Sequence, residues 1–321
     1  MHVQGIATVA CLGTGTMGHG LAFLAARAGY AVRLFGRSEQ SIQRGLAGVD
    51  RAIVLYEDSG LLAQGGGEAL KGRITGHTRM EDALNGVDMV VEALAEDVEI
   101  KRAAFLTAEQ CARSGALLAT NTSGIRLSSL AAVLARPEYF LATHFFNPPH
   151  LMLPVEICPV PATLPSVLEL GESWVRSLGR VPLRLNREVE GFIVNRLQCA
   201  CLREALHIVE SGWASAETVD AAVRYSLGRR YYSTGPLETA DMGGLDIFCA
   251  LMASVAPTLD AAAGPGTLLA DSVARGDLGV KTGKGLYDWP PEVLAARRAN
   301  REKSLIDFLR RDTQEISPAT D

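Results

Sequence analysis

The six residues Gly13-Thr14-Gly15-Thr16-Met17-Gly18 stand between an apolar run at residues 6–12 and a helical pattern at residues 17–28. A second apolar run follows at residues 31–35. In such a turn the first glycine allows the tight bend, the second lets the backbone approach a pyrophosphate, and the third lets helix and strand pack closely. The helix then meets phosphates with free N–H groups and the positive end of its dipole. The order strand, turn, helix, strand therefore predicts a dinucleotide-binding unit whose cofactor contacts include Gly13, Gly15, Thr16, Met17 and Gly18.

The alternation of strands and helices continues beyond this unit. Further strands are expected at residues 89–93, 117–120 and 140–144, and helices at residues 39–62 and 99–113, with a break at the glycine run 65–67. Strands that alternate with long helices indicate parallel β-α-β units. We therefore expect a Rossmann-type, doubly wound α/β domain.

The pattern changes near residues 182–190. Beyond that point we expect only helices, at residues 191–211, 216–225, 247–259, 266–275 and 291–311. The sequence thus predicts two domains, a dinucleotide-binding domain at residues 1–186 and an all-helical domain at residues 187–321, which carries substrate-binding and dimerisation surfaces.

Composition excludes several classes of function. The 321 residues are 48% hydrophobic and 21% charged, the balance of a globular protein, and the net charge of −5 gives no reason to expect nucleic acid or an anionic membrane as a partner. The six cysteines contain no C-x-x-C pair, so we expect no metal site. The N-terminus lacks the basic region of a signal peptide, and its apolar run is too short to span a bilayer, so a cytoplasmic location is expected.

The end of the second strand bears on the choice of cofactor. An NAD site usually has an acidic residue there to accept from the ribose 2′-hydroxyl, whereas this sequence reads Gly36-Arg37-Ser38. Arg37 and Ser38 could bind a 2′-phosphate as ionic partner and hydrogen-bond donor. The sequence therefore favours NADP over NAD as the nicotinamide cofactor, although Arg37 could instead stack on the adenine or stay solvated.

Four polar residues form a candidate catalytic set. Ser123 follows a strand, His144 ends the next one, Glu156 lies twelve residues further on, and Asn195 belongs to the stretch Gly191-Phe192-Ile193-Val194-Asn195-Arg196. Each residue alone would be read as a turn, structural, surface or cap residue. Together, in this order and spacing, and with the stretches at 234–238, 244–246 and 281–288, they resemble the 3-hydroxyacyl-CoA dehydrogenase family.

The resemblance implies a role for each residue. His144 would be the general base, oriented by Glu156, and an imidazole paired with a carboxylate can take a hydroxyl proton near neutral pH. Ser123 and Asn195 would hydrogen-bond the reacting oxygen or the adjacent carbonyl. Further cofactor contacts would be Glu96, Lys101 and Asn121. The resemblance also implies a homodimer formed through the helical domain.

The substrate is left open between two classes. Typical acyl-CoA members carry a lysine where this chain has Leu153, and the proline-rich loop at residues 147–154 is more similar to relatives that act on L-gulonate or carnitine. The arm at residues 57–76 holds only Lys71 and Arg73 as cations, although CoA phosphates need cationic partners. We expect a short 3-hydroxyacyl-CoA, as the family default, with a small free 3-hydroxy acid as the alternative.

Two alternative interpretations of the sequence agree less well with its residues. The other β-hydroxyacid dehydrogenases use a lysine early in the interdomain helix, and residues 191–210 contain none. A non-catalytic protein on the same fold, such as the related lens crystallins, would not need both His144 and Glu156, which are present.

Overall fold

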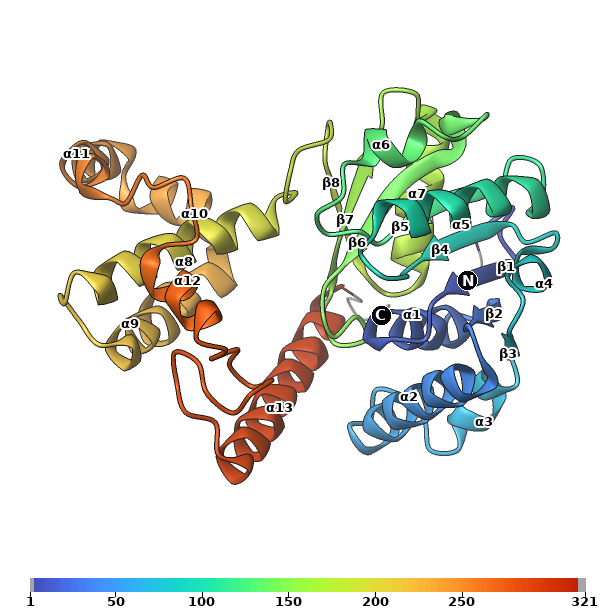
Figure 1. The fold of residues 1–321 in the computed structure, drawn as a ribbon, viewed down its shortest axis with the longest axis horizontal. Coiled ribbons are helices and arrows are strands. Elements are labelled where there is room, and N and C mark those ends of the chain that lie inside the picture. Colours follow the sequence, from blue (N-terminus) through green and yellow to red (C-terminus); the bar gives the residue numbers. More distant parts are fainter. Residues whose placement is uncertain (1–2, 317–321) are drawn as a thin grey trace. The chain divides into compact units, whose positions relative to one another are not determined.

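The computed structural model describes residues 3–316 (Figure 1), so residues 1, 2 and 317–321 of the two expected domains lie outside it. The chain forms two compact units. The first runs to Ile193 and includes the chain again from Arg301, and the second covers Val194–Asn300.

This division corrects the predicted boundary at residues 186/187 in two ways. Phe192 is buried in the core of the first unit, so the linker belongs to that unit up to Ile193. The end of the last helix also returns to the first unit, because Leu309 is buried there and Leu305 and Ile306 pack against the same core. Apolar contact therefore decides the assignment of both segments.

An eight-stranded sheet lies at the centre of the first unit (Figure 1). The strand order is β3-β2-β1-β4-β5-β6-β7-β8, and every pair is parallel except β6 with β7. The order reverses between β1 and β4, which is where open α/β sheets bind ligands at the carboxyl ends of their strands. The strands are β1 (Thr8–Leu12), β2 (Ala31–Phe35), β3 (Ile74–His77), β4 (Met89–Glu92), β5 (Leu117–Thr120), β6 (Phe140–Phe145), β7 (Pro154–Pro159) and β8 (Val181–Arg184).

Helices cover both faces of this sheet. Successive residues of β1 alternate between two apolar clusters, since Val9 and Cys11 join one while Ala10 and Leu12 join the other. The first cluster includes side chains of α1, α2 and α7, and the second includes those of α5 and α6. The helices are α1 (Thr16–Arg27), α2 (Glu39–Asp58), α3 (Gly66–Lys71), α4 (Met80–Leu84), α5 (Val98–Cys111), α6 (Leu127–Ala131) and α7 (Pro165–Ser177).

The expected doubly wound sheet is confirmed, but three of its strands were not predicted. β3 and β8 are the edges of the sheet, and edge strands are short and only weakly patterned. β7 begins and ends with a proline, which usually argues against a strand. The helix expected at residues 39–62 ends at Asp58, and Gly65 adopts a left-handed φ of 77° just before α3 begins.

The second unit is helical. Among residues 194–316 the structure contains no strand, only two isolated bridges that involve Gly279, Lys284 and Asp288. Its elements are α8 (Val194–Glu210), α9 (Ala216–Ala222), a π turn (Val223–Leu227), α10 (Gly228–Gly243), α11 (Leu245–Val255), a 3-10 turn (Ala256–Thr258), α12 (Thr267–Ala274) and the first part of α13 (Pro291–Ile316), which continues into the first unit. The all-helical expectation is confirmed, although α10 was not predicted because Gly235 and Pro236 interrupt its pattern with a kink.

No single helix of residues 3–316 is both long and apolar enough to cross a membrane. One bent pair of helical segments, at residues 216–243 and 245–258, reaches the necessary length and composition only when the two are taken together.

The second unit has almost no buried interior. Among residues 194–300 only Leu206 and Ser272 are buried. Large apolar side chains are exposed along α10 and α11 instead, with Leu237 at 85%, Met242 at 75% and Ile247 at 62%. Contiguous exposed apolar surface of this kind is typical of an interaction site.

Candidate active site

The three glycines of the turn between β1 and α1 differ in what a side chain at each position would meet. Gly13 has a φ of 116°, and a Cβ there would lie 2.4 Å from the Ala93 carbonyl oxygen. A Cβ on Gly18 would lie 1.9 Å from the Gly13 carbonyl oxygen, so this position also admits only glycine. Gly15 is exposed, and a Cβ on it would meet nothing within 4 Å. The space above Gly15 is therefore open on the side where a pyrophosphate would approach.

The N-terminus of α1 is free to bind an anion. Gly15 is its N-cap residue, no side chain caps the helix, and its first turn contains no acidic residue. The N–H groups of Thr16 and Met17 and the positive end of the helix dipole can therefore face a phosphate. These features fit a dinucleotide cofactor, which Gly15, Thr16 and Met17 would hold through their backbone.

Gly36, directly after β2, leaves no room for a Cβ unless neighbouring side chains move. A Cβ there would lie 2.5 Å from Ser41 Oγ and 2.8 Å from Thr14 Cγ2. Ser41 is held in place because Ser38 and Ser41 cap α2 reciprocally, at 3.1 and 3.2 Å. The absence of an acid at this position thus reflects packing as well as sequence.

Ser38 and Arg37 differ in whether their side chains already have a hydrogen-bond partner. The Ser38 hydroxyl already accepts the Ser41 N–H as the helix cap, whereas Arg37 is exposed and has no ion pair or hydrogen bond within residues 3–316. Of the two residues expected to bind a 2′-phosphate, Arg37 is the one with a free side chain.

Glu96 holds the turn that follows β5. Its Oε1 accepts from the Thr122 hydroxyl at 2.5 Å and from the backbone N–H groups of Ser123 and Gly124, both at 3.0 Å. Burial opposes the charge of Glu96, but the hydrogen bond from Thr122 and the charge of Lys101 lower the pKa of its carboxyl group below the ordinary value. The ionised carboxylate thus positions Ser123.

Lys101 lies beneath this turn rather than beside open space. Its side chain is 1% exposed, and its Nζ lies 2.7 Å from Glu92 Oε1 and 3.2 Å from Glu96 Oε2. Glu92 is fully buried and also accepts from the Thr120 hydroxyl at 2.7 Å. The expectation that Lys101 touches the cofactor is therefore revised: its ammonium group positions two carboxylates, and Glu96 is the member of the set that faces outward.

Asn121 joins the ends of β5 and β6. Its Oδ1 accepts from the Phe145 N–H at 2.8 Å, which leaves its amide nitrogen with no partner in the described part of the chain. Ser123, two residues later, is exposed, and its hydroxyl is unpartnered within the same residues. Both side chains are therefore available to a ligand at the carboxyl ends of these strands.

His144 and Glu156 form the centre of the site. They stand directly opposite each other in the antiparallel pairing of β6 and β7, and His144 Nδ1 lies 2.7 Å from Glu156 Oε2. Their side chains are 6% and 0% exposed. The other carboxylate oxygen, Oε1, accepts the Ile193 N–H at 2.7 Å. A carboxylate on Nδ1 selects the tautomer in which Nδ1 carries the hydrogen and Nε2 can accept a proton.

Aromatic rings hold the imidazole of His144 in place. The ring of Phe192 stacks on it at 5.1 Å and 20°, and that of Phe146 meets it edge to face at 4.7 Å. Its Nε2 has no hydrogen-bond partner among residues 3–316. The geometry therefore presents one unshared nitrogen in an otherwise fixed ring, which is what a general base requires.

Asn195 lies on α8 in the second unit, partly exposed. Its expected hydrogen bond to the reacting oxygen stays a prediction.

Glu92 and Phe192 were not predicted as site residues from the sequence. Glu92 ends the apolar strand β4, and a charged residue at the end of a fully buried run was the available signal. Phe192 gave no such signal, because its contact with His144 depends on the path of the chain between distant elements.

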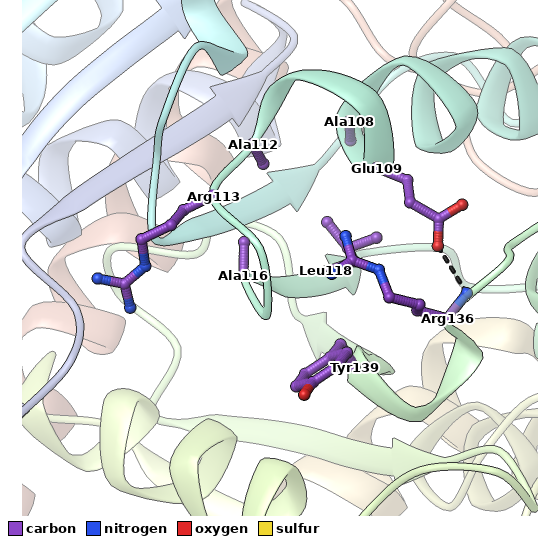
Figure 2. A pocket seen from close by; sticks show the side chains of 8 residues that line it. All are labelled: Ala108, Glu109, Ala112, Arg113, Ala116, Leu118, Arg136 and Tyr139. Atoms are coloured by element: carbon purple, nitrogen blue, oxygen red, sulfur yellow. Dashed lines mark hydrogen bonds between the residues drawn. The ribbon is translucent and has the colours of Figure 1, made fainter.

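The first unit also contains two hollows that neither His144 nor Glu156 lines. Figure 2 shows a small one lined by α5 and by Arg136 and Tyr139, where Glu109 accepts the Arg136 N–H at 2.7 Å; its volume of about 10 Å³ suits a single water molecule. A cavity of about 500 Å³ is lined by residues that include His19, Arg51 and His150. Burial, together with the nearby charges of His19 and Arg180, lowers the pKa of His150 to about 4, so this imidazole is neutral at physiological pH.

Comparison with known proteins agrees with this geometry. Residues 8–189 match the model of the 3-hydroxyacyl-CoA dehydrogenase NAD binding domain, and residues 191–289 match that of the 3-hydroxyacyl-CoA dehydrogenase C-terminal domain. The chain belongs to the 3-hydroxyacyl-CoA dehydrogenase family. α13 lies beyond both matched segments.

Relatives within the family differ in substrate. The chain is 29% identical to the 5-formyl-3-hydroxy-2-methylpyridine 4-carboxylate 5-dehydrogenase of Mesorhizobium japonicum, over 94% of the chain and 96% of that protein. It is 34% identical to the 3-hydroxyadipyl-CoA dehydrogenase of Escherichia coli, over 89% of the chain and 60% of that protein. Among solved structures, a 5-formyl-3-hydroxy-2-methylpyridine 4-carboxylic acid 5-dehydrogenase aligns with a TM-score of 0.89 and 28% identity, over 96% of the chain and 99% of its own. The (S)-3-hydroxybutyryl-CoA dehydrogenase of Ralstonia eutropha aligns with a TM-score of 0.74 and 33% identity, over 89% and 99%.

Two alanine variants of the glycine turn separate cofactor binding from folding. Gly15→Ala should keep the wild-type melting temperature, because its Cβ meets nothing, but should weaken NADH and NADPH binding by blocking the approach of the pyrophosphate. Gly18→Ala should lower the melting temperature, because its Cβ would overlap the Gly13 carbonyl. Thermal unfolding and cofactor titration check both, and unchanged cofactor affinity in Gly15→Ala would contradict this assignment.

Replacing either member of the catalytic pair should slow turnover in a distinct way. His144→Gln should lower kcat by roughly 10²–10⁴-fold, the usual contribution of a general base, with cofactor affinity unchanged. Glu156→Gln should also lower kcat, because a neutral amide no longer stabilises the imidazolium that forms when His144 takes the substrate proton. His77→Gln is the matched control, since His77 lies on the edge strand β3 and should leave both quantities unaltered. Wild-type turnover in His144→Gln would show that another residue is the base.

Proposed function

We propose that this protein is an NAD(P)-dependent dehydrogenase that interconverts a 3-hydroxyl and a 3-keto group on a small free acid. The observation that carries the chemistry is the His144–Glu156 pair with its unshared Nε2. The substrate class is supported by the arm formed by the end of α2 and by α3, and it differs from the acyl-CoA expected as the family default.

Both cations of that arm are already engaged. Lys71 Nζ lies 3.0 Å from Asp50 and 3.9 Å from Glu68. Arg73 Nη1 donates to the carbonyls of Ala69 at 3.1 Å and Ala26 at 3.5 Å. A CoA tail needs free cations for its phosphates. The arm contains only these two cations, and each already has a partner within the protein, which favours a substrate without CoA.

Structural likeness supports the same class. The structure of the 5-formyl-3-hydroxy-2-methylpyridine 4-carboxylic acid 5-dehydrogenase aligns with a TM-score of 0.89, against 0.74 for the (S)-3-hydroxybutyryl-CoA dehydrogenase of Ralstonia eutropha. The end of α13 packs onto the first unit, where Arg310 donates to the Ser59 carbonyl at the end of α2. The end of α2 is therefore in contact with a helix that neither family model includes.

A short 3-hydroxyacyl-CoA is the second candidate. It is favoured by the 34% identity to the 3-hydroxyadipyl-CoA dehydrogenase, which exceeds the identity to the pyridine carboxylate enzyme.

Each side chain of the site has its own role in the proposed reaction. Nε2 of His144 takes the proton of the substrate hydroxyl, and Glu156 stabilises the imidazolium that results. The Ser123 hydroxyl, positioned by Glu96, donates to the reacting oxygen. When bound, the nicotinamide cofactor supplies the acceptor for two electrons and the hydrogen of the carbinol carbon. In the reverse direction the same imidazolium returns the proton.

Turnover screening tests this proposal. Short free 3-hydroxy acids and the matching 3-hydroxyacyl-CoAs are offered to the wild-type protein with NAD and with NADP. Higher kcat/KM on a free acid is the expected result. Higher kcat/KM on the CoA ester would establish the second candidate, and no turnover in either series would overturn both.

Arg37 should make the protein prefer NADPH. A charge-assisted contact with the 2′-phosphate contributes about 1.5–3 kcal/mol, so NADPH should bind about 10- to 150-fold more tightly than NADH, and Arg37→Ala should remove most of that difference. Arg176→Ala, which removes an exposed arginine of α7, is the control. Fluorescence titration of both reduced cofactors measures the preference. Equal or tighter binding of NADH to the wild type would end the NADP assignment.

Gly36→Asp does not test the cofactor preference cleanly, because its side chain would collide with Ser41 and Thr14.

We infer that two copies of the chain associate through the second unit, because α10 and α11 expose most of their apolar side chains and the unit lacks a buried core. Light scattering should give about twice the 34.2 kDa of one chain. Glutamate in place of both Ile247 and Leu251 should yield monomers, while Leu106→Glu on α5 of the first unit, also an exposed apolar position, should not. A wild-type monomer at micromolar concentration would contradict the inference.

A further inference from the structure

Phe192 has an unusual backbone conformation. Its φ is 51°, and it is the only residue other than glycine with a positive φ within residues 3–316. Bulky L-residues rarely adopt this left-handed conformation, and where they do it is commonly at functional sites whose surroundings enforce it. The conformation therefore requires a reason in the contacts of this residue.

Phe192 contacts His144, and the residue that follows it bonds to Glu156. Its ring is 3% exposed and stacks on the His144 imidazole at 5.1 Å and 20°. The next backbone N–H, that of Ile193, donates to Glu156 Oε1 at 2.7 Å. Two consecutive residues thus fix both members of the pair, one through its ring and the other through its backbone.

The segment that carries these residues is itself anchored. Arg126 donates to Glu190 Oε1 from Nε at 3.0 Å and from Nη2 at 2.8 Å, and Glu188 accepts the Ser128 N–H at 3.2 Å. These bonds tie the segment to the start of α6, just after the turn that holds Ser123. Because the anchor lies on the same unit as His144, the left-handed residue can be kept where its ring meets the imidazole.

We propose that Phe192 is a positioning residue for the reaction: its stacked ring and its left-handed backbone together hold the His144 imidazole and the Glu156 carboxylate so that Nε2 stays directed at the substrate hydroxyl. This inference rests on the proposed function. Loss of the ring frees the imidazole to rotate about its side-chain bonds, and general-base catalysis depends on the geometry of proton transfer.

The test compares substitutions that remove or keep the ring. Phe192→Leu should lower kcat at least tenfold while KM and cofactor affinity stay near wild type, and Phe192→Tyr, which keeps the stacked ring, should retain wild-type kcat. Phe105→Leu is the matched control, because Phe105 is fully buried in the same apolar cluster but packs on Phe140 instead. It should lower the melting temperature and leave kcat unchanged. If Phe192→Leu does not fold, Phe192→Met, which retains more volume, replaces it.

Nuclear magnetic resonance of the imidazole separates this inference from the proposed function. In the wild-type protein the Nδ1 proton of His144, bonded to Glu156, should give a slowly exchanging downfield signal that broadens in Phe192→Leu and persists in Phe105→Leu. Wild-type kcat and an undisturbed signal in Phe192→Leu would overturn the inference. A wild-type protein with no turnover on any substrate but with this pattern of signals would overturn the proposed function alone.

Discussion

The hydrogen bond between His144 Nδ1 and Glu156 Oε2 depends on one feature of the sheet, the reversal of strand direction at β7. All other strand pairs are parallel, and parallel neighbours need long crossover connections. The antiparallel pairing lets a short loop bring a residue at the end of β6 directly opposite one on β7. Glu156 is fully buried, and both of its carboxyl oxygens have partners, His144 on one and the Ile193 N–H on the other.

A second buried charge network supports the neighbouring strand ends. Glu92, Lys101 and Glu96 form a chain of ion pairs that runs from the interior of the sheet to the turn at Ser123. Burying such charges costs free energy unless each one is compensated. Here each charge has a partner, and the outermost carboxylate, Glu96, holds the turn through the Thr122 hydroxyl and the N–H groups of Ser123 and Gly124. Together the two networks place Ser123 and His144 at the ends of adjacent strands.

The local parts of this arrangement could be predicted from the sequence. The glycine turn is carried by one short motif, whereas His144 and Glu156 were predicted from the order and spacing that they share with the 3-hydroxyacyl-CoA dehydrogenase family. The burial of Lys101, by contrast, follows from which elements surround it, and no pattern of neighbouring residues marks it. The same holds for Phe192, whose ring reaches His144 only because the linker folds back along α6. The return of α13 to the first unit escaped prediction because its charged sequence gives no sign of the few apolar residues, such as Leu309, that dock it.

At Gly36, close packing of the neighbouring side chains and the absence of the acid typical of an NAD site occur at the same residue. The sequence shows only that no acid is present, whereas the structure shows that even a Cβ there would require Ser41 and Thr14 to move. The central feature of the proposed reaction is that Nε2 of His144 faces the substrate hydroxyl. The most direct measurement is the distance between these two atoms in a crystal structure of the protein with a reduced nicotinamide cofactor and a bound 3-hydroxy acid. We expect a hydrogen bond of about 2.6–3.2 Å. A bound hydroxyl that lies out of reach of Nε2 and is held by other side chains would contradict the account.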